Sequence, residues 1–179
     1  MLRAFTPLTV ATALLFTVTF ASADAAKIGD QAPAWVNLPG TDGTTHGLAD
    51  LKDAPAVVVA FTCNHCPVAI AYEDRFNAFA KVYKAKGVAF VAINCNNLDV
   101  DKLPAMKERA AEKGFGFDYL YDESQKIGKQ FGAKATPHLF VLDKDRKLVY
   151  AGAFDDKMEE KSVTKHYVRN AVDAILAGK

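Results

Sequence analysis

The chain has 179 residues, of which 50% are hydrophobic and 24% charged, a composition typical of one compact globular domain. It excludes a disordered chain, a collagen helix and a coiled coil. The 22 basic side chains nearly balance the 21 acidic ones and form no basic run, which argues against nucleic acid as a partner. The 3 cysteines are too few for a disulfide-rich scaffold, but only two residues separate Cys63 from Cys66. We therefore look for function at this pair.

The first residues have the pattern of an export signal. Arg3 and the terminal amine precede an uncharged apolar run, Leu8–Ala21, that is short for a membrane span. Small residues after the run fit a signal peptidase site, so residues 1–23 are predicted to be a signal peptide, with cleavage as late as residue 26 as a second choice. An uncleaved membrane anchor is the alternative. Either way, the domain at residues 27–179 is predicted to be exported, and thus periplasmic or secreted.

The first predicted elements lead to a buried strand. Ala32–Leu38 is predicted to be a short strand, and the turn at Gly40–Gly43 makes it half of a small hairpin before the core. Val57–Phe61 is a continuous apolar, β-branched run, as in strands that are covered on both faces, and it leads directly to Cys63. Apolar side chains then recur every three or four residues and predict a helix that ends at Gly87. These side chains are Val68, Tyr72, Phe76, Phe79 and Tyr83.

The rest of the chain alternates between strands and helices. We expect strands at Val88–Ile93, Tyr119–Tyr121, His138–Leu142 and Leu148–Ala153, and helices at Leu103–Lys113, Ser124–Phe131 and around Val168, Val172 and Ile175. This order predicts an α/β fold with a βαβ core, a helical connection, a hairpin and a last helix. Because parallel strands end at one edge of a sheet, Cys63, Cys66, Cys95 and the loop before His138 are expected to meet there.

Pro67 decides which cysteine lies at the start of the first helix. If Cys63 were the N-cap, Pro67 would be the fourth helical residue, where its missing N–H and its ring cost about 3 kcal/mol. If Cys66 is the N-cap, Pro67 is the first helical residue, where proline is favoured. The helix dipole and the free N–H groups stabilise a thiolate at that place. Cys66 is therefore predicted to be the nucleophile and Cys63 the resolving cysteine.

Other interpretations of this segment stay open. When protonated, His65 can lower the pKa of a neighbouring thiol, or it is simply an exposed loop residue. The two cysteines could form a permanent, inert disulfide, although such small rings are usually reducible. Zinc is disfavoured because a single Cys-x-x-Cys without further paired ligands offers too few donors.

Three motifs together resemble those of a known superfamily. Phe61–Pro67 (FTCNHCP), followed by a long helix and by Ala135–His138 (ATPH), resembles the thioredoxin-like superfamily. Within it, Gly29–Pro33 (GDQAP) resembles the opening of the redoxin, or peroxiredoxin-like, group, which includes alkyl hydroperoxide reductases and thiol-specific antioxidant proteins. The resemblance implies a thioredoxin-like fold with a central mixed β-sheet flanked by helices and an N-terminal β-hairpin extension.

The resemblance also implies a substrate-binding turn. By it, Pro137 is a cis-proline that faces the Cys-x-x-Cys segment, and the backbone beside Pro137 pairs with substrate as an added strand. Thr136 and His138 flank this proline and are candidate substrate-binding residues. His138 is alternatively just the first residue of an edge strand.

Two features depart from the pattern of the superfamily. Ala60 stands where thioredoxins carry a buried acid, so the proton of the second sulfur must be handled by His65, by water or by another acid. The peroxiredoxin pattern P-x-x-x-[ST]-x-x-C does not match this sequence, whether its last position is taken as Cys63 or as Cys66. This second departure argues against efficient peroxide reduction.

Two further features are expected to have no chemistry. Cys95 ends the second buried strand and could resolve an oxidised Cys66, add a third thiolate to a metal, or be an inert apolar cysteine, which is the reading we favour. Asp155-Asp156 is expected to be a solvated turn, because two acids alone do not form a calcium site.

These residues predict an exported thiol-disulfide oxidoreductase. Cys66 attacks a substrate disulfide, and Cys63 then releases the reduced product by closing the Cys63–Cys66 bond. The expected partners are a protein or small-molecule disulfide and an exported or membrane-bound dithiol donor, and no metal or organic cofactor is expected. One alternative is a peroxiredoxin-like thiol peroxidase in which Cys63 or Cys95 resolves a Cys66 sulfenic acid. The other is a copper-binding chaperone of thioredoxin fold, in which thiolates and a histidine such as His138 bind Cu(I).

Overall fold

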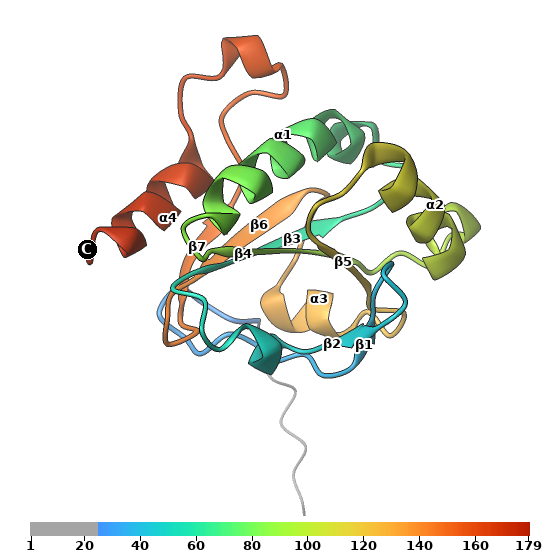
Figure 1. Cartoon of the computed structure of the whole chain (residues 1–179), viewed down its shortest axis with the longest axis horizontal. Coiled ribbons are helices and arrows are strands. Elements are labelled where there is room, and N and C mark those ends of the chain that lie inside the picture. Colours follow the sequence, from blue (N-terminus) through green and yellow to red (C-terminus); the bar gives the residue numbers. More distant parts are fainter. Residues whose placement is uncertain (1–24) are drawn as a thin grey trace, which may run out of the picture.

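The computed structural model describes residues 25–179, so the predicted signal peptide lies outside the described residues. At the centre is a five-stranded sheet in the order β5-β4-β3-β6-β7 (Figure 1). The strands are β3 (Val57–Thr62), β4 (Ala89–Asn94), β5 (Asp118–Tyr121), β6 (His138–Leu142) and β7 (Leu148–Gly152). β3, β4 and β5 are parallel, whereas β6 pairs antiparallel with both β3 and β7. The predicted mixed sheet is confirmed.

Helices cover both faces of this sheet (Figure 1). One face packs against α1 (Pro67–Lys84), α2 (Leu103–Lys113) and α4 (Tyr167–Leu176), and the other against α3 (Lys126–Phe131). The four aromatic side chains of the predicted apolar face of α1 are buried and fill the first interface, whereas its fifth member, Val68, is 40% exposed. These four are Tyr72, Phe76, Phe79 and Tyr83. Among residues 25–179, no helix is long and apolar enough to cross a membrane.

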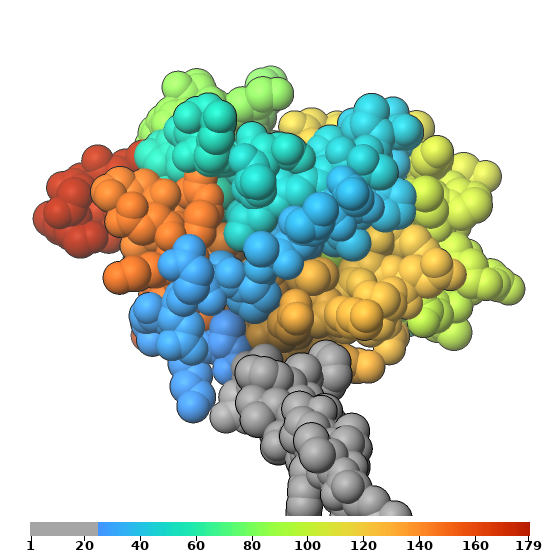
Figure 2. All heavy atoms as spheres, turned by 90° about the horizontal axis from the view of Figure 1, so that it is seen from below, coloured from blue at the N-terminus to red at the C-terminus, as the bar shows by residue number. Residues whose placement is uncertain are grey.

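The N-terminal segment completes the α3 face of the sheet. Trp35 and Leu48 pack there with Phe61 of β3 and Phe131 of α3. Figure 2 shows this segment, in blue, crossing the surface beside the residues around α3, in amber. Burial of these large apolar side chains therefore fixes the N-terminal segment to the core.

The first hairpin is shorter than the sequence predicts. Only Leu38–Pro39 (β1) and Thr45–His46 (β2) pair, and most of Ala32–Leu38 is irregular. Its apolar side chains are buried by packing rather than by strand pairing, and Asn37 has a φ of 55°, which interrupts an extended backbone. The predicted strands and helices of the core are present, with ends shifted by at most three residues, the largest shift being at the end of α1.

Asp155 is not part of a solvated turn, which corrects the expectation from sequence. The residue is 3% exposed, and its carboxylate accepts hydrogen bonds from Arg75 Nη1 at 2.6 Å and Tyr72 OH at 2.9 Å. Both donors belong to α1. A buried ion pair therefore ties the loop after β7 to the first helix.

Removing one side of this ion pair should destabilise the protein strongly. In the Asp155→Ala variant, Arg75 stays buried without a counter-charge, and we expect the free energy of unfolding to fall by about 3–5 kcal/mol. Urea unfolding followed by circular dichroism measures this change. Lys144→Ala, which breaks the exposed Lys144–Asp145 pair, is the control and should cost less than about 1 kcal/mol. An equally small loss in both variants would contradict the structural role of the buried pair.

Candidate active site

The Cys-x-x-Cys segment leaves the sheet at the edge where several elements meet. Cys63 directly follows β3, whose register pairs Thr62 with Asn94 of β4 and Phe61 with His138 of β6. The end of β4 and the turn before β6 therefore flank the cysteine segment on two sides. The predicted convergence at one sheet edge is confirmed.

Cys66 is the N-cap of α1 and Pro67 is its first residue, as the proline argument predicts. Burial raises the pKa of the Cys66 thiol, but the nearby Thr136 side chain and the N–H groups of Ala69 and Val68 stabilise its thiolate and outweigh burial. These N–H groups are free to bind the sulfur because the first helical turn has no acceptors for them. The pKa of Cys66 therefore lies below its ordinary value.

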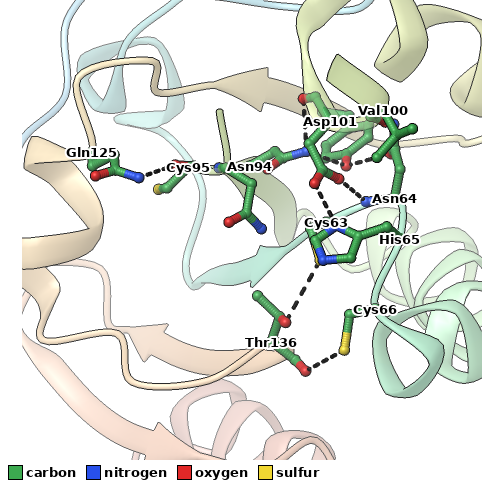
Figure 3. A network of polar contacts seen from close by, with 12 residues as sticks. Cys63, Asn64, His65, Cys66, Asn94, Cys95, Val100, Asp101, Gln125 and Thr136 are labelled. Atoms are coloured by element: carbon green, nitrogen blue, oxygen red, sulfur yellow. Dashed lines mark hydrogen bonds and ion pairs between the residues drawn. The ribbon is translucent and has the colours of Figure 1, made fainter. Parts of the chain in front are cut away.

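Cys63 has the opposite environment. It is only 2% exposed, and burial, together with the nearby Asp101 carboxylate, raises the pKa of its thiol despite a hydrogen bond with Thr136. Its thiol donates to Thr136 Oγ1 at 3.6 Å, and the Cys66 thiol donates to the Thr136 carbonyl oxygen at 3.4 Å (Figure 3). The Thr136–Pro137 peptide is cis, as the resemblance implies. Both free thiols thus contact the turn that precedes β6.

A carboxylate that the sequence analysis did not single out lies beside Cys63. Asp101 ends the short 3-10 helix η2 (Asp99–Asp101), and its side chain is completely buried. Its Oδ1 accepts a hydrogen bond from the Asn64 N–H at 2.7 Å, and its Oδ2 is bonded to His65 Nδ1 (Figure 3). Asp101 therefore holds both residues that separate the two cysteines. Spacing alone does not distinguish it from the exposed Asp99, so the sequence carries no signal for this role.

His138 lies at the start of β6, as predicted, but it is not among the residues that line the cavity beside Cys66. Its ring packs on Phe140 with centroids 4.5 Å apart, and its Nδ1 accepts a hydrogen bond from the Lys134 N–H at 3.2 Å. Burial lowers the pKa of His138. The contacts of this ring are those of a packed strand residue.

A cavity of about 530 Å³ opens beside Cys66, and Cys66, His65 and Thr136 line one side of it. Cys95 and Gly128 are among the residues lining the rest. Burial and the Asp122 carboxylate, which accepts a hydrogen bond from the Cys95 thiol at 3.6 Å, raise the pKa of Cys95 to about 12. Cys95 therefore shares the cavity with Cys66 but is a poor source of thiolate.

One group within residues 25–179 has the side-chain types of a metal site. Donor atoms of Cys63, His65 and Asp101 all lie within 4.8 Å of one another. However, His65 Nδ1 and Asp101 Oδ2 are hydrogen-bonded to each other, and Asp101 Oδ1 already accepts a hydrogen bond from the Asn64 N–H. This is the geometry of a hydrogen-bonded cluster, and a cation would have to displace these contacts.

Comparison with known proteins gives the family of the chain. The model of the redoxin family matches residues 27–167. The chain belongs to the redoxin family. This redoxin is 30% identical over 130 residues to the thiol-disulfide oxidoreductase ResA of Bacillus thuringiensis (strain Al Hakam), an alignment covering 73% of this chain and 72% of the relative. The predicted family is thereby confirmed, and the redoxin is a thiol-disulfide oxidoreductase.

Solved structures confirm the thioredoxin-like fold. The structure of protein SMc02350 from Sinorhizobium meliloti 1021 has a TM-score of 0.80 and 39% identity to the redoxin, and the match covers 88% of each chain. The thiol:disulfide interchange protein DsbE from Chlorobium tepidum has a TM-score of 0.71 and 23% identity, covering 85% of this chain and 99% of that one, and it supports the fold alone.

The opposed environments of the two sulfurs predict selective alkylation. At mildly acidic pH, iodoacetamide should label Cys66 of the reduced redoxin on the order of tenfold or more faster than Cys63, because the pKa of Cys66 is lowered and that of Cys63 is raised. Peptide mapping by mass spectrometry after timed quenching measures both rates. Faster labelling of Cys63 would contradict the assignment from the helix N-cap.

Proposed function

We propose that this redoxin is an exported thiol-disulfide oxidoreductase in which Cys66 is the attacking nucleophile and Cys63 the resolving thiol. The observation that carries the assignment is the asymmetry of the two sulfurs. Cys66 is partly exposed at the helix N-cap with a lowered pKa, whereas Cys63 is 2% exposed with a raised pKa. An external disulfide needs an accessible thiolate, and Cys66 is the better source of one.

The reaction proceeds by two exchanges. The Cys66 thiolate attacks a substrate disulfide and forms a mixed disulfide with one of its sulfurs. Cys63 then attacks Cys66 Sγ, the Cys63–Cys66 bond closes, and the reduced substrate leaves. A dithiol donor reduces the Cys63–Cys66 disulfide again and completes the cycle.

The turn before β6 is the proposed binding place for the substrate backbone. The Cys66 thiol already donates to the Thr136 carbonyl, so a substrate bound at Cys66 lies next to the backbone on either side of Pro137. A chain in this position can pair with that backbone as an added strand. A substrate side chain can enter the cavity beside Cys66, so we propose protein or small-molecule disulfides as substrates.

The two-exchange scheme predicts distinct defects in cysteine variants. Cys63→Ser should accumulate a stable mixed disulfide through Cys66 with a glutathione or peptide disulfide, because the resolving thiol is absent, whereas Cys66→Ser should form none. The wild type should interconvert between dithiol and disulfide in glutathione buffers of graded potential. Mass spectrometry after acid quenching identifies each species.

Cys95→Ser is the matched control in these experiments. It removes a thiol of the same cavity and should still cycle between the Cys63–Cys66 dithiol and disulfide. A mixed disulfide trapped in Cys95→Ser would instead make Cys95 the resolving thiol, and one trapped on Cys63 would reverse the proposed order.

Export is proposed from the pattern of residues 1–23. Expressed in full in a bacterium with a periplasm, the protein should appear there with Asp24 as its first residue, as shown by fractionation and intact-mass measurement. Leu15→Arg places a charge in the apolar run and should leave the precursor in the cytoplasm. An intact chain in the cytoplasm of the wild-type strain would contradict export, and an intact chain in the membrane would support the uncleaved anchor.

A further inference from the structure

The resolving step requires a proton acceptor inside the protein. Cys63 must lose its proton before it attacks Cys66, but it is 2% exposed and burial raises its pKa. The place where thioredoxins carry a buried acid is occupied by Ala60, which is fully buried in the apolar core. The acceptor therefore has to come from another element.

Asp101 has the position that this acceptor needs. Its carboxylate lies within 4.8 Å of Cys63 Sγ, a distance that one bridging water spans. Its side chain is completely buried, whereas that of its partner His65 is 42% exposed. We propose that Asp101 accepts the proton of Cys63 in the resolving step and that His65, which is hydrogen-bonded to Asp101, releases a proton of its own to solvent in exchange. This inference rests on the proposed role of Cys63 as the resolving thiol.

The charge of the site favours this route. Asp101 opposes a thiolate at Cys63, because its carboxylate raises the pKa of that thiol. Loss of the proton to bulk water would leave two negative charges side by side in a buried site, whereas transfer to Asp101 leaves one. The acceptor thus removes its own repulsion at the moment when the Cys63 thiolate forms.

Every bond and proton is accounted for in the step. The Cys63 proton passes to Asp101, the Cys63–Cys66 bond forms, and the bond between Cys66 and the substrate sulfur breaks. The substrate leaves as a thiolate and takes a proton from water. The Nδ1 proton of His65 already points to the Asp101 carboxylate, so the imidazolium releases its Nε2 proton to solvent as Asp101 becomes neutral. Cys63 regains its proton from Asp101 when the dithiol donor reduces the Cys63–Cys66 disulfide. The two electrons gained by the substrate disulfide come from the Cys63–Cys66 dithiol.

The surroundings of Asp101 keep the carboxylate in place. Asn94 Nδ2 donates to the Asp101 backbone carbonyl at 3.1 Å, and Asn64 Nδ2 donates to the Val100 carbonyl at 2.8 Å. Burial, and after it charges that include Asp101, raises the pKa of Tyr119 and Tyr121 of β5, which face this site. Glu73 of α1 acts on Tyr119 and is paired with Arg109. Lys102, the next residue along the chain, is paired with Asp99.

The Asp101→Asn variant tests the proposal because it keeps the shape of the side chain. A stopped-flow experiment with an aromatic disulfide such as dithiobis(nitrobenzoate) separates the steps: attack by Cys66 releases the first thionitrobenzoate, and resolution by Cys63 releases the second. For Asp101→Asn we expect an unchanged first release and a second release slower by on the order of 100-fold at pH 7. The second release should recover about tenfold per pH unit as hydroxide replaces the lost base.

Two further variants sharpen the experiment. Asp99→Asn removes an exposed carboxylate of the same 3-10 helix. It is the matched control and should leave both releases unchanged. His65→Gln removes the ring that releases the compensating proton while keeping a side-chain donor, so its second release should slow and should be restored by added imidazole. Unchanged circular dichroism and a normal first release show that each variant is folded.

The sign of the effect decides between mechanisms. A carboxylate that acted only through its charge would give a faster second release in Asp101→Asn, because removing the charge lowers the pKa of Cys63. A faster or unchanged second release therefore overturns the relay while leaving the order of the cysteines intact. A wild-type protein that gives no first release from Cys66 would instead overturn the proposed function, and the relay with it.

Discussion

The chemistry of this redoxin depends on where α1 begins, and Pro67 fixes that point. Proline has no N–H to donate, so it is stable in the first helical position and costly further along. Cys66 is consequently the N-cap, where the N–H groups of Val68 and Ala69 help to lower the pKa of its thiol. Cys63 remains in the segment that leaves β3, beneath the surface. The same constraint therefore makes one thiol accessible and ionisable and leaves the other buried and protonated.

The sheet supplies the two sides that hold the cysteine segment. β3 pairs with β4 on one side and with β6 on the other, so the chain after β4 and the turn before β6 both reach the end of β3. Thr136 contacts the two sulfurs, while Asp101 binds the two residues between them. Because the elements that carry Thr136 and Asp101 belong to the packed core, the site is positioned before any substrate binds.

The sequence predicts those features whose causes are local. The apolar run Val57–Phe61 is enough to predict β3, and apolar side chains at every third or fourth residue are enough to predict α1. Pro67 in turn predicts the N-cap. Asp101 and Asp155 could not be predicted, because each is an acid in a polar stretch until the fold places it against a partner far along the chain. The first hairpin is shorter than predicted for a related reason. Trp35 is buried by packing against the core and not by strand pairing, so its apolar character does not indicate a strand.

The position of the acid changes what the residues between the cysteines do. An acid on β3, at the place of Ala60, would reach the buried sulfur without touching the intervening residues. Asp101 instead reaches it from η2 and is hydrogen-bonded to Asn64 and His65. Its orientation therefore depends on these two residues, and theirs depends on Asp101. In this redoxin the pair between the cysteines and the buried carboxylate thus form one unit, so a change in any of the three residues alters the environment of Cys63 directly.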